Sequence, residues 1–223
     1  MSTVREGWNR YAAAWATRYG GYDLRRAPAA VRRWQRLAYR VARIMAAVRV
    51  PGRALTVVAL GLAGAVPFLA ARGGSWLALA AGLVVLATLA GTVEAAMAVL
   101  RPRSWRTAEI RESVTELLAE VAWLVAFWVV GVAGPLVVAC GALSGLYEYV
   151  RVQAVGAGMS RLAAQTAGDR PVRLLLVVVG LALAGLAGDD LAAGLLTVTS
   201  AVWLALAVLG LTQLAGAVRR SLG

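Results

Sequence analysis

Long apolar stretches separated by short polar breaks dominate the sequence from residue 54 onward. They predict six helices, at residues 54–71, 75–100, 112–133, 135–158, 172–187 and 191–217. Several reach the ~20 residues that a helix needs to cross a membrane, and the fifth is shorter. Glycine and proline breaks lie between them, such as Gly134-Pro135 and Gly188-Asp189-Asp190. We therefore expect residues 54–223 to form an all-α domain of six transmembrane helices.

The first 53 residues follow a different pattern, in which polar and apolar positions share one helix. Residues 1–20 place four aromatic side chains at spacings of three and four: Trp8, Tyr11, Trp15 and Tyr19. In residues 29–49, an apolar face (Val31, Trp34, Leu37, Val41, Ile44, Val48) opposes a basic one (Arg32, Arg33, Arg36, Arg40, Arg43). Such a helix lies in the plane of a membrane with anionic headgroups. Residues 1–53 are thus predicted to be amphipathic interfacial helices.

Composition supports a membrane protein and excludes several kinds of chemistry. The chain of 223 residues is 61% hydrophobic, with a mean hydropathy of +0.72. All 23 basic residues are arginine, and there is no histidine, so imidazole metal sites and Ser-His-Asp triads are excluded. The lone Cys140 lies in an apolar run and reads as a packing residue. The net charge of +12 is better explained by membrane orientation than by a nucleic-acid partner, and we expect no nucleic acid to bind.

The positions of the arginines predict that orientation. Twelve lie at or before Arg53, four in residues 101–111, four between Arg151 and Arg173, and two at the C-terminus, which makes twenty-two. Only Arg72 lies on the other side. By the positive-inside rule, both termini face the cytoplasm. We expect an integral protein of the bacterial inner (plasma) membrane, in contact with its lipids.

An acidic stretch, residues 91–120, holds five of the eleven acids: Glu94, Glu109, Glu112, Glu116 and Glu120. Pro102 is expected to end one helix and Ser104 to cap the next, giving an antiparallel hairpin. Glu94 and Glu116 are each eleven positions from Trp105, so they should lie level, with Glu112 one turn nearer the bend. Three carboxylates would then meet just inside the cytoplasmic membrane surface.

Two interpretations of these acids remain open. Carboxylates from facing helices suit a hard cation such as Mg²⁺ or Mn²⁺, and a cation beside arginines suits phosphate-bearing substrates. Alternatively, the acids of residues 109–120 pair with Arg103, Arg106, Arg111 or Arg151. We favour pairing for Glu109 and an arginine or polar partner for Glu120. For Glu94, Glu112 and Glu116 we favour the metal site, because two helices contribute to one level.

The spacing of this stretch resembles the CDP-alcohol phosphatidyltransferase family, whose signature is D-x2-D-G-x2-A-R-x8-G-x3-D-x3-D. Without gaps, the signature falls on Gly91, Glu94, Ala95, Ala98, Val99, Ala108, Glu112 and Glu116. Residues 50–56, Val-Pro-Gly-Arg-Ala-Leu-Thr, also resemble the start of the first span in that family. The family consists of integral membrane enzymes with six helices and an N-terminal interfacial helix.

The resemblance implies a function and a set of site residues. Glu94, Glu112 and Glu116 would bind Mg²⁺ or Mn²⁺, and Glu116 would be the base that activates the acceptor alcohol. Nucleotide or phosphate contacts would come from Thr56, Ala95, Ala98, Arg101 and Arg103, the two arginines replacing the one lost at Val99. The reaction would transfer a phosphoalcohol or phosphatidyl group from a CDP-linked donor to a lipid or small alcohol and release CMP. Family members commonly dimerise, which implies a homodimer.

The departures from the signature leave three hypotheses. Glutamate replaces three aspartates, and the first aspartate and the arginine are replaced by Gly91 and Val99. Mg²⁺ demands near-ideal octahedral geometry, so these changes should slow catalysis. The chain is therefore either an active enzyme or a catalytically silent pseudoenzyme that scaffolds or regulates a membrane lipid enzyme. A small transporter is the third and weaker hypothesis.

A few further positions carry minor predictions. Gly141 with Gly145, and Gly61 with Gly64, are candidate helix-packing positions. Glu148 and Arg151 are expected to form an ion pair within one helix. Thr212 and Gln213 are expected to make interhelical hydrogen bonds.

Overall fold

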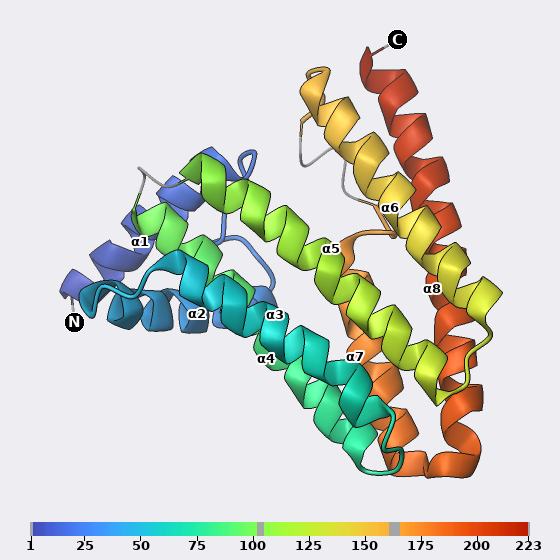
Figure 1. Cartoon of the computed structure of the whole chain (residues 1–223). Coiled ribbons are helices and arrows are strands. Elements are labelled where there is room, and N and C mark those ends of the chain that lie inside the picture. The colour runs from blue at the N-terminus through green and yellow to red at the C-terminus, as the bar shows by residue number, and fades with distance from the viewer. Residues whose placement is uncertain (1, 102–104, 161–165, 223) are drawn as a thin grey trace. The chain divides into compact units, whose positions relative to one another are not determined.

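The computed structural model describes residues 2–101, 105–160 and 166–222, and the side chains of all of these except residues 2–5, 105–108 and 222. The predicted breaker residues Pro102 and Ser104, and Arg103 between them, lie outside the described residues. The described residues form eight helices and no strand (Figure 1). They are α1 (Ser2–Arg18), α2 (Ala29–Ala47), α3 (Gly52–Ala70), α4 (Trp76–Leu100), α5 (Trp105–Val130), α6 (Gly134–Gly156), α7 (Arg170–Ala187) and α8 (Asp189–Leu222).

The predicted all-α class is confirmed, with one helix at each predicted apolar segment. Within the described residues, five helices (α3, α4, α5, α7 and α8) are long and apolar enough to cross a membrane. The chain is therefore an integral membrane protein. The remaining apolar helix, α6, carries Glu148 and Arg151 and is not among the five. The count of six transmembrane helices stays a prediction.

The chain divides into two compact units whose boundaries fall within α3, α4 and α5. Unit 1 comprises Met1–Leu60 and Ala87–Glu116, and unit 2 comprises Gly61–Leu86 and Leu117–Gly223. Each unit holds its own buried residues and its own polar contacts, so we describe them separately. The predicted division at residue 53 stays a prediction.

Unit 1 is built around aromatic side chains from α1. Trp8, Tyr11 and Trp15 are buried in one cluster with residues of α2 and of the second half of α4. The Trp15 and Tyr19 rings stack with centroids 4.0 Å apart. The stripe recognised at residues 8–19 thus faces the interior of unit 1. Burial of this much aromatic surface is the main stabilising term of such a small core.

The second helix presents three faces rather than two. Gln35, Ala38, Tyr39 and Ala42 are its buried residues and pack within unit 1. Part of the predicted apolar face remains outside this core: Leu37, Ile44 and Val48 are 46%, 60% and 65% exposed, whereas Val41 packs against the core. The predicted helix is confirmed, and the exposed part of its apolar face is available for contact with another apolar phase.

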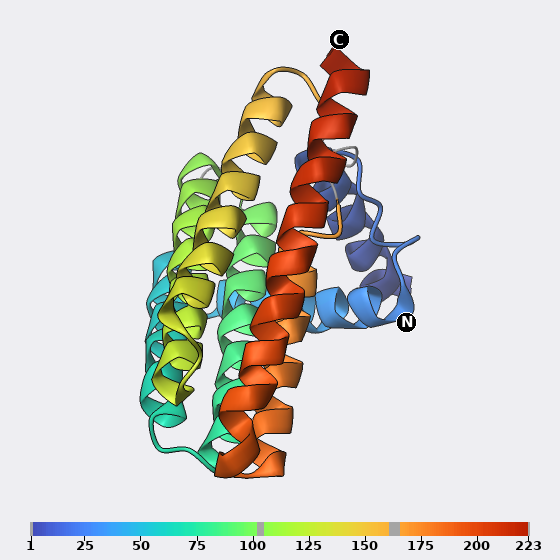
Figure 2. The same cartoon turned by 90° about the vertical axis from the view of Figure 1, so that its right-hand side faces the viewer.

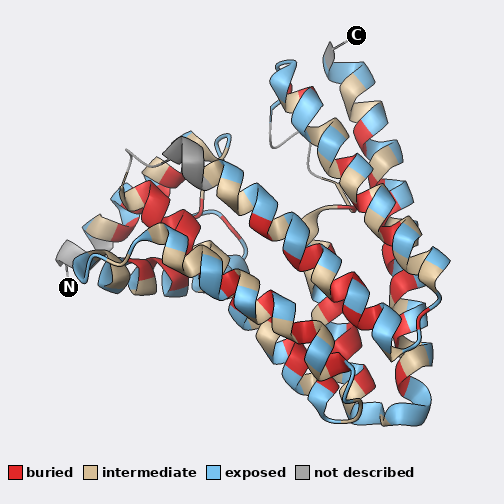
Figure 3. Ribbon diagram, viewed as in Figure 1, coloured by how far each residue is buried: buried red, intermediate tan, exposed pale blue. Residues whose placement is uncertain are grey.

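In unit 2, α8 packs against both α6 and α7, and the two views agree on this arrangement (Figures 1 and 2). Buried residues recur along α8 at helical spacing, separated by exposed ones (Figure 3). They include Leu196, Ser200, Trp203, Ala207 and Leu214. One side of α8 therefore forms the core of unit 2, and the exposed apolar residues on the other sides suit contact with lipid.

The close helix contacts of unit 2 use glycines that differ in part from the predicted ones. A Cβ on Gly185 of α7 would lie 2.5 Å from the backbone nitrogen of Ala78 in α4, so only glycine fits there. A Cβ on Gly141 would lie 3.1 Å from a methyl group of Leu124, which agrees with a packing role. The prediction was wrong for Gly61, Gly64 and Gly145, where a Cβ would meet nothing within 4 Å. Small-residue spacing does not reveal which face a neighbour covers.

Candidate functional site

A pocket of about 190 Å³ lies in unit 1, where α3 begins and α4 ends. Its lining residues come from three helices and the segment before α3: Pro51, Gly52, Arg53, Glu94, Met97, Ala98, Arg101 and Arg111. Three arginines against one glutamate give the lining a net charge of 3 − 1 = +2. The N-terminus of α3 adds the backbone N–H groups of a first helical turn and the positive end of a helix dipole. The pocket therefore favours an anion.

Glu94 is the acid at the centre of this pocket. Its side chain is only 6% exposed, and both carboxylate oxygens are engaged. Arg111 of α5 donates from Nε and Nη2 to Oε1, at 3.1 and 3.0 Å, and the Thr56 hydroxyl donates to Oε2 at 2.6 Å. A buried carboxylate needs such partners, because an unpaired charge in this setting is costly. The structure thus gives Glu94 an arginine and a threonine as partners, from α5 and α3.

The phosphate-binding residues predicted from the sequence are only partly placed at the pocket. Ala98 and Arg101 line it, and Thr56 contacts Glu94 beside it. Arg101 also donates to the Val50 and Ala46 carbonyl oxygens, at 3.1 and 2.8 Å, which anchors the end of α4 to the last turn of α2 and to the segment that follows it. Ala95 is buried in the aromatic cluster of unit 1 and does not line the pocket. Arg103 lies outside the described residues.

Helix α1 reaches the same region through its last turn. Arg18 donates to the Ala98 carbonyl oxygen at 2.6 Å, and Tyr19 donates to the Glu112 carboxylate at 3.3 Å. Burial, and then the negative charge of Glu112, raise the pKa of the Tyr19 phenol well above its usual value of 10. The raised pKa favours the protonated phenol, which is the form that donates the hydrogen bond to Glu112. The aromatic stripe of α1 thus ends on one of the predicted site acids.

The predicted three-carboxylate metal site is not assembled. Within the residues that the structure describes, no three acidic or cysteine side chains come together in a group that could hold a metal ion. The physical reason is visible at Glu94, whose carboxylate is taken by Arg111 and Thr56. The donor set therefore does not fit a Mg²⁺ or Mn²⁺ site formed by Glu94, Glu112 and Glu116. The catalytic role of Glu116, which is half-buried in α5, stays a prediction.

Two positions of the signature differ in how they would accept the family residue. A Cβ on Gly91 would meet nothing within 4 Å among the described residues, so a residue larger than glycine can begin its side chain there without a clash. Val99 is buried in the core of unit 1 beside the aromatic cluster. An arginine at position 99 would place its charge in that apolar core. The packing of unit 1 therefore disfavours an arginine at position 99, whereas no described neighbour crowds position 91.

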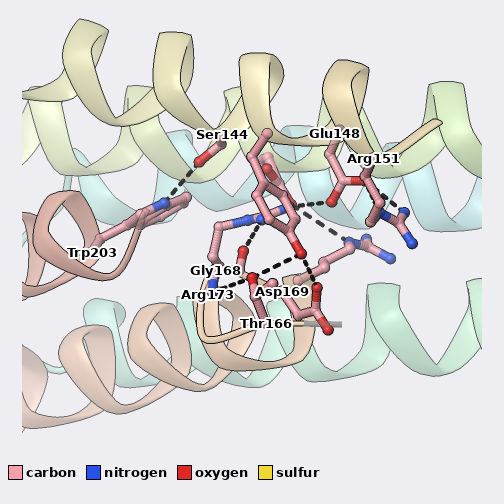
Figure 4. A network of polar contacts seen from close by, with 11 residues as sticks. Ser144, Glu148, Arg151, Thr166, Gly168, Asp169, Arg173 and Trp203 are labelled. Atoms are coloured by element: carbon pink, nitrogen blue, oxygen red, sulfur yellow. Dashed lines mark hydrogen bonds and ion pairs between the residues drawn. The ribbon is translucent and has the colours of Figure 1, made fainter. Parts of the chain in front are cut away.

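Unit 2 contains a second polar centre, which the sequence analysis missed. Arg173 of α7 is buried and donates to Glu120 of α5, at 3.2 and 2.8 Å, and to Glu148 of α6 at 3.0 Å (Figure 4). It also donates to the Gly168 carbonyl oxygen. Arg151 donates to the other oxygen of Glu148, at 2.9 and 2.6 Å. One guanidinium thus joins three helices of unit 2.

The loop before α7 completes this network. The Tyr147 hydroxyl donates to Asp169, and Thr166 donates to the Tyr147 oxygen at 3.0 Å (Figure 4). Burial raises the pKa of Asp169 above its usual value of 3.8, and the hydrogen bond from Tyr147 opposes that rise. The sequence signal for the whole network was charge inside apolar segments: Glu120, Glu148 and Arg173 all lie within helices. The sequence places Arg173 with the arginines of the fourth connection, whereas the structure places it in α7, where it is buried.

Several smaller predictions can now be judged. The arginine partner expected for Glu120 is confirmed, and so is the Glu148–Arg151 pair. Cys140 is buried, as expected for a packing residue. Gln213 accepts from the Ala167 backbone N–H at 3.1 Å, which links α8 to the loop before α7. Thr212 instead bonds the Leu209 carbonyl oxygen of its own helix, so the interhelical prediction was wrong for that residue.

Comparison with known proteins supports the fold. No protein-family model matches the chain, and no curated protein matches its sequence. Among solved structures, the chain is similar to the Mycobacterium tuberculosis phosphatidylinositol phosphate synthase, crystallised with CDP-DAG bound. The match has a TM-score of 0.61 at 21% identity and covers 82% of this chain and 92% of the other. The fold is therefore that of a membrane phosphatidyltransferase, and the resemblance drawn from the signature is confirmed at the level of the fold.

Proposed function

We propose that this protein is a CDP-alcohol phosphatidyltransferase-like enzyme that transfers a phosphoalcohol or phosphatidyl group from a CDP-linked donor to an alcohol and releases CMP. The observation that carries the proposal is the shared fold with a synthase crystallised with CDP-DAG. The arginine-lined pocket of unit 1 supports it, because a diphosphate is an anion that arginine binds in bidentate geometry. The pocket is the proposed site of the donor diphosphate.

The reaction requires that the chain binds the diphosphate, balances the charge that develops on it, and accepts a proton from the acceptor alcohol. Arginines of the pocket hold the diphosphate and balance the charge that develops on the transferred phosphoryl group. Glu116 accepts the proton of the acceptor alcohol as its oxygen forms a bond to the phosphorus nearer the lipid or alcohol group. The bond from that phosphorus to the CMP oxygen breaks, and CMP leaves. The product is a phosphodiester of the acceptor.

The placement in the membrane is part of the proposal. Six helices would span the bilayer, including α6, with both termini on the cytoplasmic side of the bacterial inner membrane. The exposed apolar residues of α2 beside its arginines support a position for that helix at the membrane surface. The acceptor would be a lipid or small alcohol, and dimerisation stays a prediction.

The test is release of CMP from CDP-diacylglycerol by the purified protein in detergent, with a panel of acceptors: inositol phosphate, glycerol phosphate, inositol and serine. We expect CMP release that depends on one acceptor and falls at least about 100-fold in Glu116→Gln, the usual effect of losing a general base. The matched control is Glu6→Gln, which removes an exposed acid of α1. CMP release that is absent, or unchanged in Glu116→Gln, contradicts the proposal.

A second candidate, the silent pseudoenzyme, is favoured by one specific observation. The ion pair between Glu94 and Arg111 leaves the described residues without a three-carboxylate site. A protein that retains the scaffold and its donor pocket without turnover would bind CDP-diacylglycerol and release no CMP. Gly91→Asp separates the two candidates further, since a Cβ at that position would meet no described atom within 4 Å. Activity gained in this variant would indicate a catalytic site that was lost.

A further inference from the structure

Arg111 occupies the place where the signature spacing predicts a cation. Its guanidinium lies against Glu94, the first acid of the stretch, with two hydrogen bonds to one oxygen. Thr56 satisfies the other oxygen at 2.6 Å. A metal ion would have to displace both donors from a carboxylate that is only 6% exposed. The cation beside Glu94 is therefore the guanidinium group of Arg111.

The same guanidinium also faces the pocket. Arg111 is one of the pocket-lining residues, and its side chain remains 34% exposed although Glu94 is nearly enclosed. A guanidinium has five N–H donors, and the hydrogen bonds of Arg111 to Glu94 come from Nε and Nη2. Donors therefore remain for a ligand in the pocket. Glu94 fixes the orientation of this group, which lowers the entropic cost of binding a phosphate.

The neighbouring charges fit a diphosphate without further help. Besides Arg111, which pairs with Glu94, the lining holds two more guanidinium groups, those of Arg53 and Arg101. Arg101 donates to two backbone carbonyl oxygens, which hold its guanidinium group in place. The start of α3 contributes backbone N–H groups on the same wall. Two arginine charges and a helix N-terminus suit the two negative charges of a diphosphate diester.

We propose that Arg111 substitutes for the divalent cation in this site, so that the pocket binds a nucleoside diphosphate-linked lipid without any metal ion. The inference rests on the proposed function, because it concerns the same donor. It differs from it in one measurable respect: the ion requirement of binding. Glu94 then serves to position Arg111 instead of ligating a metal.

The test measures binding of CDP-diacylglycerol to the detergent-solubilised full chain, by calorimetry, in excess EDTA and in excess MgCl₂. We expect dissociation constants that agree within about threefold in the two conditions. Arg111→Gln should weaken binding in EDTA at least about tenfold, the usual effect of losing a charged hydrogen-bond donor. Arg111→Lys keeps a cation beside Glu94 and should fold as the wild type does, with an intermediate loss. Arg220→Gln removes an exposed charge from α8 and should bind as the wild type does.

A second measurement needs no variant of Arg111. Titration of Mn²⁺ into the ligand-free protein, followed by electron paramagnetic resonance, should show no more bound ion in the wild type than in Glu94→Gln. Stoichiometric Mn²⁺ that Glu94→Gln removes would overturn the inference. Binding of CDP-diacylglycerol only when Mg²⁺ is present would overturn it too, while leaving the proposed function standing. Absence of binding in both conditions would instead contradict the proposed function, and the inference with it.

Discussion

At the scale of single residues, the chain stabilises its buried acids with arginines and hydroxyls. Glu94 and Glu120 are both buried, and each accepts hydrogen bonds from a guanidinium on another helix. Glu94 also accepts from the Thr56 hydroxyl. Isolated charges inside a membrane protein are costly, and paired ones are tolerated. Removal of one partner should therefore destabilise the fold.

Thr56→Val removes the hydroxyl partner of Glu94 with little change of shape. Hydrogen bonds to charged groups contribute about 1.5–3 kcal/mol, so the unfolding midpoint should fall by roughly 3–10 °C. Thr197→Val is the matched control, because Thr197 is exposed and bonds only the Ala193 carbonyl oxygen of its own helix. Thermal unfolding in detergent, followed by circular dichroism, compares the two. Equal midpoints for both variants would mean that Thr56 does not stabilise Glu94.

Arg173→Met leaves Glu120 buried without its main partner. Breaking a buried ion pair in this way costs about 3–5 kcal/mol, whereas replacing both partners costs much less. The double variant Glu120→Gln with Arg173→Met should therefore recover at least half of the stability lost in Arg173→Met. Glu148 retains Arg151 in both variants, so it does not confuse the comparison. Losses that simply add in the double variant would show that the two side chains are not coupled.

Asp169 gives the stability of unit 2 a pH dependence. Because burial raises the pKa of Asp169 above 3.8, the folded state binds its proton more tightly than the unfolded state does. Its contribution to the unfolding free energy is therefore largest below pH 3.8 and is lost as the pH rises through the raised value. Asp169→Asn should flatten the pH dependence of the unfolding midpoint, whereas Asp190→Asn, at an exposed site, should preserve it. The same slope in all three proteins would contradict this account.

At the scale of helices, close packing depends on glycines that a neighbour's backbone approaches. Gly185→Ala would bring a methyl group to within 2.5 Å of the Ala78 backbone nitrogen, so α4 and α7 must shift. We expect a loss of about 1–3 kcal/mol. Gly61→Ala places its methyl group where nothing lies within 4 Å and should be neutral or stabilising, because alanine favours the helix. Thermal unfolding of the two variants side by side measures the difference, and an equal effect of both would refute it.

The helices themselves were predictable, and their partners were not. Apolar runs ended by glycine or proline indicated each helix, because the bilayer demands long apolar helices whatever they pack against. The partner of Glu94 depends on how two helices are rotated about their axes, which sequence spacing does not fix. Equal distances from the bend predicted that the Glu94 carboxylate would lie beside those of Glu112 and Glu116. In the structure, the Glu94 carboxylate instead accepts hydrogen bonds from Arg111, seventeen residues away. For Glu120 the sequence predicted the type of partner, because a buried acid requires a cation or polar group, but it did not identify Arg173.

At the scale of the whole molecule, the signature spacing proved more informative than the signature residues. Only Ala98 of the eight positions is unchanged, yet the fold matches a phosphatidyltransferase over 82% of the chain. Spacing is retained because it sets the length and register of two helices, whereas individual ligands can be exchanged. Val99, which stands at the position of the signature arginine, is buried in the core of unit 1. The substitution of that arginine therefore affects packing as well as chemistry. A shared fold does not establish a shared activity, so the activity of this protein must be tested through the residues of the unit 1 pocket.

The proposed function requires that the pocket between the start of α3 and the end of α4 binds a CDP-linked donor. The most direct measurement is equilibrium binding of CDP-diacylglycerol to the wild type and to Ala98→Trp, whose larger side chain would fill the pocket, with the exposed Glu6→Gln as control. We expect saturable binding in the wild type and the control, competition by CMP, and loss of binding in Ala98→Trp. Binding that survives in a correctly folded Ala98→Trp, or that CMP does not displace, would contradict the proposed function.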